Sequence, residues 1–344
     1  MGGAETLTAH RSPLTAHRVT VWNSRPEGRF DRVLEVDGLV RTYGDVRALA
    51  GMTFAVEPGA VTGFLGPNGA GKTTTMRAIF GLVALDAGEV RWDGRRIDAT
   101  ARRHFGYLPE ERGLYPTMKV LDQLEYLGRL RGLSAEDART EAATWLADLG
   151  LADRAGDNLE DLSLGNQQRV ELIGALIHEP DVLVLDEPFS GLDPVAVDAL
   201  SKVLVAEARR GATVVFSSHQ LDLVEDLCER AVVVDRGRVV AEGTIDELTA
   251  GADPVLEIEV PTDPDGTWTA ALDGIDVLSI NAGRVRLQLP TGAGSPAERA
   301  QEALDAARRA GPINRFGFER RSLAEVFLAT VGRSVETSGA GDHA

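Results

Sequence analysis

The chain has 344 residues, 43% of them hydrophobic, which is enough for one large domain or one with a smaller companion. No apolar run approaches the roughly 20 residues of a membrane-spanning helix, and the basic N-terminus lacks an apolar core, so we expect no anchor and no signal peptide. The formal net charge of −17 argues against a nucleic-acid partner, because such proteins usually carry a basic footprint. The one cysteine, Cys228, permits no internal disulfide, indicates a reducing compartment and is expected in the core.

The main part of the chain is predicted to alternate strands with helices. Residues 1–33 show little apolar patterning and are predicted to be a disordered tail. A helix is expected after the glycines at 66–71, and residues 118–150 are predicted to be mostly helical. Strands are predicted at residues 33–44, 49–56, 59–66, 182–186, 213–217 and 231–235. This order indicates an α/β fold with a mostly parallel sheet covered on both faces.

The pattern of apolar residues changes after about residue 250. Half-buried strands are predicted at 255–260 and 284–289, and helices at 296–311 and 322–332. We therefore expect a small α+β domain over residues 251–333, followed by a disordered tail at 334–344. Dimer contact and regulation are both open as roles for this domain.

A phosphate-binding loop is predicted in "GFLGPNGAGKTTT". Gly66 is followed after four residues by Gly71, Lys72 and Thr73, and glycines at these places let backbone amides surround a polyphosphate. Lys72 can reach the terminal phosphates, and the Thr73 hydroxyl can bind magnesium. The helix that follows directs its positive end at the same anion. The strand before the loop and the helix after it are the context that nucleotide binding requires.

Two acids and one histidine follow later strands. In "DVLVLDEP", Asp186 and Glu187 stand at the carboxyl end of a buried strand, where open α/β sheets bind ligands. Asp186 is expected to hold magnesium and Glu187 to position the attacking water, which is most of what phosphoryl transfer asks of a protein. His219, in "VVFSSHQ", follows another strand, where it can contact the terminal phosphate.

The order of these motifs resembles the ATP-binding subunits of ABC transporters over residues 34–250. The resemblance implies a P-loop ATPase fold with a helical subdomain at about 112–168, with "SGLDP" as the D-loop and "SSHQ" as the switch region. It implies that Tyr43 stacks on adenine. It also implies a Walker A loop that binds ATP through Gly66, Pro67, Asn68, Gly69, Ala70, Gly71, Lys72, Thr73 and Thr74.

The segment "LSLGNQQRV" stands where this family has its signature, most often LSGGQ. In the family, two subunits face each other head to tail, and the signature of one covers the ATP of the other. The resemblance therefore implies a homodimer in which Ser163, the Gly165 amide and Asn166 contact the partner's nucleotide. Leu164 replaces the first glycine of the usual signature, and Asn166 replaces its glutamine.

A second departure lies in "YLPEERGLYPTM", where Glu110 occupies the place of the family's Q-loop glutamine. Its oxygen is expected to reach toward magnesium, with one more negative charge than glutamine brings. Together with the small C-terminal domain, this region is similar to the sodium- and drug-exporter branch. The resemblance implies a separate integral permease near residues 111–118, and a location on the inner face of the cell membrane.

Three other functions are alternatives to a transport ATPase. An ABC-type ATPase acting on nucleic acid or ribosomes is the main alternative. DNA-repair members contain a long coiled coil, but this chain shows no sustained heptad repeat. Ribosome-acting members carry two cassettes, whereas this chain has one phosphate loop, and its acidic composition also counts against a nucleic-acid partner. A small-molecule kinase would leave the signature segment and His219 without a role. A binding module that does not hydrolyse ATP is disfavoured because all four expected residues are present: Lys72, Asp186, Glu187 and His219.

Overall fold

The computed structural model describes residues 32–111, 113–250, 254–289, 295–319, 322–328 and 330–331. Apart from residues 32 and 33, the two predicted disordered tails lie outside these ranges. The chain divides into two compact units. The first unit contains Met1–Gln220 and Leu227–Val239, and the second contains Leu221–Asp226 and Val240–Ala344.

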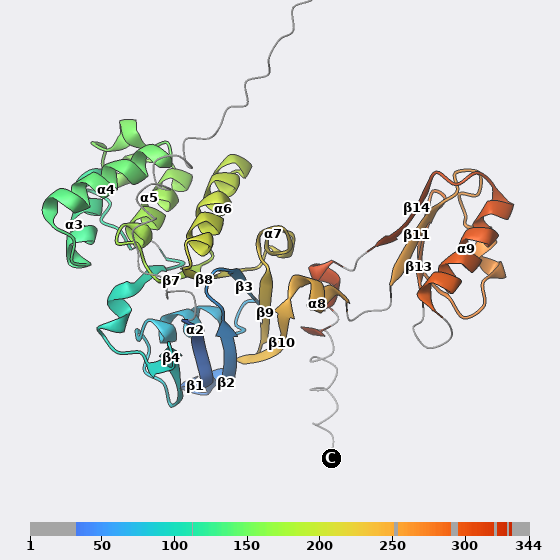
Figure 1. Ribbon diagram of the computed structural model, residues 1–344, viewed down its shortest axis with the longest axis horizontal. Helices are drawn as coiled ribbons and strands as arrows, with labels where there is room; N and C mark the ends of the chain where they lie inside the picture. Colours follow the sequence, from blue (N-terminus) through green and yellow to red (C-terminus); the bar gives the residue numbers. More distant parts are fainter. Residues whose placement is uncertain are drawn as a thin grey trace, which may run out of the picture. The chain divides into compact units, whose positions relative to one another are not determined.

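A six-stranded sheet with the order β10-β9-β3-β8-β7-β6 has its strands in the first unit, except for β10 from Val240 onward (Figure 1). Its strands are β3 (Val61–Leu65), β6 (Phe105–Leu108), β7 (Val182–Asp186), β8 (Thr213–Ser218), β9 (Arg230–Asp235) and β10 (Arg238–Thr244). The pairs β3–β8, β3–β9, β6–β7 and β7–β8 are parallel. Every residue of β3, β7 and β8 is buried, as expected for central strands of a parallel sheet. The predicted parallel sheet is confirmed.

The first two predicted strands belong to a separate antiparallel sheet, with the order β2-β1-β4-β5. Its strands are β1 (Leu34–Tyr43), β2 (Val46–Val56), β4 (Ala87–Trp92) and β5 (Arg95–Arg96). Leu34 and Met52 from this sheet share one buried core with Phe64 of β3 and Met76 of the helix after the phosphate loop. The sequence did not separate the two sheets, because strand pairing depends on partners distant in the chain.

Helices follow the phosphate loop and occupy most of residues 118–150, as predicted, and two more flank β7 (Figure 1). They are α2 (Lys72–Ile79), α3 (Val120–Leu130), α4 (Ala135–Asp148), α5 (Leu164–Leu176) and α6 (Pro194–Arg209). Ser134, Ser163 and Asp193 cap α4, α5 and α6, each accepting a hydrogen bond from the backbone amide three residues on. Cys228 is buried as predicted, and burial raises the pKa of its thiol.

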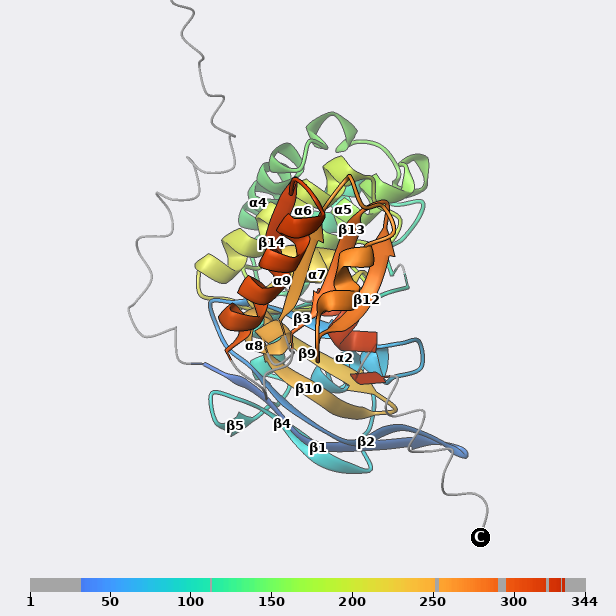
Figure 2. The ribbon, with the colours of Figure 1, turned by 90° about the vertical axis from the view of Figure 1, so that its right-hand side faces the viewer.

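The second unit contains α7 (Leu221–Leu227, through Asp226), α8 (Ile245–Ala250) and a four-stranded antiparallel sheet with the order β12-β13-β11-β14. Its strands are β11 (Val255–Glu259), β12 (Asp276–Asn281), β13 (Arg284–Gln288) and β14 (Arg315–Glu319). Helix α9 (Pro296–Ala310) lies along this sheet (Figure 2), and Leu256, Ile258 and Val285 share a core with the alanines of α9. The sequence predicted β11, β13 and α9 but missed the edge strands β12 and β14.

Among the residues that the structure describes, no helix has the length and apolarity needed to cross a membrane.

Candidate functional site

The phosphate loop runs from the end of β3 to the start of α2. Gly71 has a φ of 101°, and a Cβ atom there would lie 2.6 Å from the Ala48 carbonyl oxygen. At Gly66, a Cβ atom would lie 2.5 Å from the Val234 carbonyl oxygen. Both positions therefore require glycine, because a side chain would collide with backbone of a neighbouring strand or loop.

The other loop residues differ in exposure. Asn68 and Gly69 are exposed, Ala70 is buried, and Pro67, Thr73 and Thr74 are half-buried. The first helical residue of α2 is Lys72. The loop thus ends at a helix N-terminus, where backbone amides favour an anion such as a phosphate.

Lys72 is buried and spans the loop. Its Nζ donates a hydrogen bond to the Gly66 carbonyl oxygen at 2.7 Å and lies 4.0 Å from Glu187 Oε1. The Lys72 ammonium thus links the phosphate loop to the carboxyl end of β7, and its contact with phosphates stays a prediction.

Asp186 is held by a residue that the sequence analysis did not select. Ser217 is paired with Asp186 across β7 and β8, and its Oγ donates to Asp186 Oδ1 at 2.6 Å. The same Oγ accepts from the Glu187 amide at 2.8 Å. Ser217 thus orients both acids. Its signal in the sequence is its position at the end of the strand that leads to His219.

Glu187 and His219 lie in direct contact. His219 Nδ1 is 2.9 Å from Glu187 Oε2, so the carboxylate lies between an imidazole and the Lys72 ammonium. Glu187 also has a φ of 51°, which is uncommon for a residue with a side chain. Such backbone conformations persist where the surroundings enforce them, often at functional sites.

The residues expected to hold magnesium fit a hard cation. Asp186 is 1% exposed, and its Oδ2 atom has no hydrogen-bond partner among the described residues. Thr73 Oγ1 lies 3.4 Å from Glu110 Oε2. The described residues contain no group of three or more acidic, histidine or cysteine side chains arranged for a metal. Magnesium needs no such group, because it binds through one or two protein oxygens together with substrate phosphates and water.

The signature segment forms the N-terminus of α5. Ser163 is exposed, and its Oγ accepts from the Asn166 amide at 3.4 Å, so the hydroxyl hydrogen remains able to donate. Gly165 and Asn166 are half-buried, and Leu164 is 60% exposed. The hydrogen bond that Ser163 accepts stays within its own helix cap.

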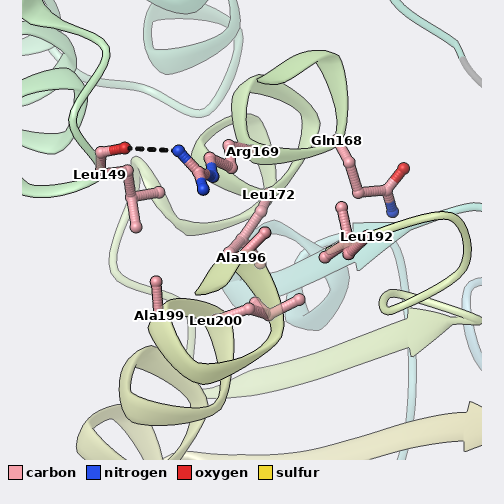
Figure 3. A pocket seen from close by; sticks show the side chains of 8 residues that line it. All are labelled: Leu149, Gln168, Arg169, Leu172, Leu192, Ala196, Ala199 and Leu200. Carbon is pink, nitrogen blue, oxygen red and sulfur yellow. Dashed lines mark hydrogen bonds between the residues drawn. The ribbon is translucent and has the colours of Figure 1, made fainter. Parts of the chain in front are cut away.

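Farther along α5, two side chains donate hydrogen bonds to backbone carbonyl oxygens outside the helix. Gln168 donates to the Pro188 carbonyl oxygen at 3.3 Å, and Arg169 donates to the Leu149 carbonyl oxygen at 3.4 Å. Figure 3 shows these two side chains at a small apolar pocket between α5 and α6, which Leu192 of the D-loop also lines. The pocket includes none of the predicted site residues.

Tyr43 lies at the end of β1 and is 44% exposed. The Arg41 guanidinium lies 4.6 Å from the centre of its ring, a distance suited to a cation–π interaction. An exposed aromatic ring is available for stacking, and its contact with adenine stays a prediction.

Comparison with known proteins identifies relatives over most of the chain. The ABC transporter family model matches residues 49–190. An uncharacterized ABC transporter ATP-binding protein, YhaQ of Bacillus subtilis (strain 168), is 37% identical over 304 residues, covering 88% of this chain and 100% of YhaQ. The daunorubicin resistance ATP-binding protein DrrA3 of Streptomyces coeruleorubidus is 35% identical over 314 residues, covering 88% of this chain and 96% of DrrA3.

Solved structures share the fold. An ATP-binding subunit of an ABC transporter matches with a TM-score of 0.59 and 33% identity, over 63% of this chain and 92% of that chain. The dimeric bacterial ABC transporter cassette MJ0796 has a TM-score of 0.57 at 24% identity, over 61% of this chain and 98% of that chain, which shows likeness of fold alone. The protein belongs to the family of ABC transporter ATP-binding subunits, which bind and hydrolyse ATP.

Proposed function

We propose that the protein powers export through a separate membrane permease, as a homodimer that hydrolyses ATP with magnesium. The observation that carries this proposal is the contact of Glu187 with both Lys72 and His219, which come from the ends of three different elements. The drug-resistance name of DrrA3 supports an exporter, and the permease follows from the family's division into separate subunits.

Each residue of the site has a distinct role in this proposal. The phosphate loop and Lys72 bind the β- and γ-phosphates, and Glu187 orients the attacking water. His219 holds the Glu187 carboxylate and can turn toward the γ-phosphate. Magnesium would be held by Thr73 and Asp186, with Glu110 beside them, and would neutralise charge on the phosphates.

The second half of each ATP site comes from the other copy. Ser163 and the Gly165 amide of one subunit donate to the γ-phosphate that is bound by Lys72 of its partner. The free hydroxyl hydrogen of Ser163 and the helix N-terminus behind it suit an anion.

Mixing two inactive variants tests this division of the site. Lys72→Ala and Ser163→Arg homodimers each have two broken sites and should be inactive. A mixed dimer gathers both lesions in one site and leaves the other native, so mixing should restore up to roughly a quarter of wild-type activity if pairing is random and the sites are independent.

The matched control for the mixture is Lys72→Ala with Glu187→Gln. In a head-to-tail dimer these two lesions fall in different sites, so mixing them should restore nothing. A Lys72→Ala and Ser163→Arg mixture that neither regains hydrolysis nor dimerises with ATP would refute the head-to-tail arrangement.

The permease is tested by membrane association. The protein, expressed together with its permease, should remain in the membrane fraction after a high-salt wash, which screens surface charge attraction. Recovery in the washed membranes without any partner would contradict the proposal, and a membrane protein that co-purifies would identify the permease.

A further inference from the structure

The outer edge of β14, in the second unit, is a sheet edge at which another strand can pair. In the sheet order β12-β13-β11-β14, the strands β12 and β14 are at the edges. Edge strands present unpaired amides and carbonyls to other chains, and bulges are one device that prevents such pairing. The register of β12 with β13 is irregular between Val277 and Ser279, whereas β14 pairs with β11 without interruption. Between these two edges, β14 is therefore the better template for another strand.

The sequence of β14, "RFGFE", is complementary to itself when two copies pair antiparallel. In an antiparallel pair centred on Gly317, Arg315 faces Glu319 of the other copy and Phe316 faces Phe318. Directly opposed opposite charges and aromatic pairs both stabilise a sheet. A parallel pair in register would instead place Arg315 against Arg315, and like charges in that position are destabilising.

The side chains of β14 are accessible for this contact. Phe316 and Phe318 are 42% and 52% exposed, which is high for two phenylalanines on one strand. A Cβ atom on Gly317 would meet nothing within 4 Å, so the sheet face at the centre of the strand is open and accepts a side chain.

Two ion pairs within the unit orient the charged ends of β14. Arg315 Nε lies 2.7 Å from Glu257 Oε1, and Glu319 Oε2 accepts from Arg286 Nε at 2.6 Å. The side chain of Arg315 nevertheless remains 61% exposed and that of Glu319 33%. Because a guanidinium has five N–H donors and a carboxylate about four acceptor positions, each can bind a second partner.

We propose that β14 pairs with β14 of a second copy, antiparallel and centred on Gly317, and so joins two four-stranded sheets into one of eight strands. The inference deepens the homodimer proposed above and rests on it for the second copy. A pair of five-residue strands is a weak contact alone, but a second contact between the same two copies raises its effective concentration.

A cysteine at the centre of the strand tests the pairing directly. In the Gly317→Cys variant of the full chain, the two new cysteines would face each other. Opposed Cα atoms in antiparallel sheets lie about 4.5–5.5 Å apart, which is within the range for a disulfide. With diamide as oxidant, we expect a covalent dimer on a non-reducing gel, measured with and without ATP and magnesium.

The matched control is Ser279→Cys, which places an exposed cysteine on the other edge strand of the same sheet. It should give at least fivefold less covalent dimer than Gly317→Cys. The wild type, whose one cysteine is buried, should give none.

The register is tested by mixing Arg315→Cys with Glu319→Cys. The mixture should cross-link, and each variant alone should not, because like positions would lie about 14 Å apart along the strand at about 3.4 Å per residue. Folding of each variant is checked by its unfolding transition, and Gly317→Cys tests the proposal by itself if the other two variants are unstable.

The proposal is overturned if Gly317→Cys cross-links no more than Ser279→Cys, both with and without ATP. Its failure is distinguishable from failure of the proposed ATP-dependent dimer, because ATP hydrolysis and the mixed-variant test report on that dimer independently. A mixture that neither regains hydrolysis nor dimerises with ATP, with an intact cross-link at position 317, would refute only the head-to-tail arrangement.

Discussion

The phosphate loop and the signature segment contain halves of one predicted reaction site, yet they differ in burial and in the contacts that their side chains make. At the loop, Glu187 contacts both Lys72 and His219, and Lys72 and Asp186 are buried. At the signature, Ser163 is exposed and its hydrogen bond lies within its own helix cap. Charged groups that work together must be held together by the fold, whereas a donor that serves another subunit must remain on the surface.

The strongest test of the loop side is Glu187→Gln. The amide has nearly the same shape as the carboxylate but cannot act as a base, so we expect kcat to fall by about 10²–10⁴ with ATP binding retained. Steady-state ATPase assays and equilibrium ATP binding measure the two effects. Gel filtration with ATP and magnesium should show a stable dimer. Hydrolysis at the wild-type rate would remove Glu187 from its proposed role.

The signature side is tested by Ser163→Ala, with Ser134→Ala as its matched control. Both serines are exposed helix caps that accept from the amide three residues on, so each substitution should cost about 1 kcal/mol of stability. Only Ser163→Ala should lower kcat/KM for ATP, by tenfold or more. Equal ATPase losses in the two variants would mean that Ser163 acts as a cap alone.

A smaller effect is expected at Glu110, which lies beside Thr73. Glu110→Gln removes a negative charge next to the proposed magnesium, so half-maximal ATPase should need several-fold more magnesium. The neighbouring exposed acid supplies the control, since Glu111→Gln should leave the magnesium titration unchanged. Identical titrations for both variants would place Glu110 outside the metal site.

The smallest effect concerns acid stability and should leave hydrolysis at neutral pH intact. Burial, followed by the charge of Arg131, lowers the pKa of His178 from 6.5 to about 4. The unfolded chain therefore binds this proton more readily than the folded one. Stability from this group is full above pH 6.5 and falls as the pH drops toward 4, by at most about 3 kcal/mol.

His178→Gln removes the titrating group but can still donate to the Phe105 carbonyl oxygen, which lies 3.2 Å from His178 Nε2. Urea unfolding between pH 7 and 4 should show a shallower loss of stability in this variant than in the wild type. The same slope in both proteins would mean that His178 does not cause the acid sensitivity.

The sequence determined the local features of the protein. The glycines of the phosphate loop and the apolar run of β7 have strong local preferences, so the loop, the strand and the acids at its end could all be predicted. The segments α3, α4 and α9 were also predictable, because a helix satisfies its backbone hydrogen bonds within the segment and repeats its apolar residues every three to four positions.

Only the tertiary structure decided which of these pieces meet. Ser217 lies 31 residues from Asp186, and its role depends on the register of β7 and β8, which no local pattern encodes. The separate antiparallel sheet and the edge strands β12 and β14 were missed for the same reason. Strands take their hydrogen-bond partners from distant parts of the chain, and a half-exposed edge strand carries a weak apolar pattern.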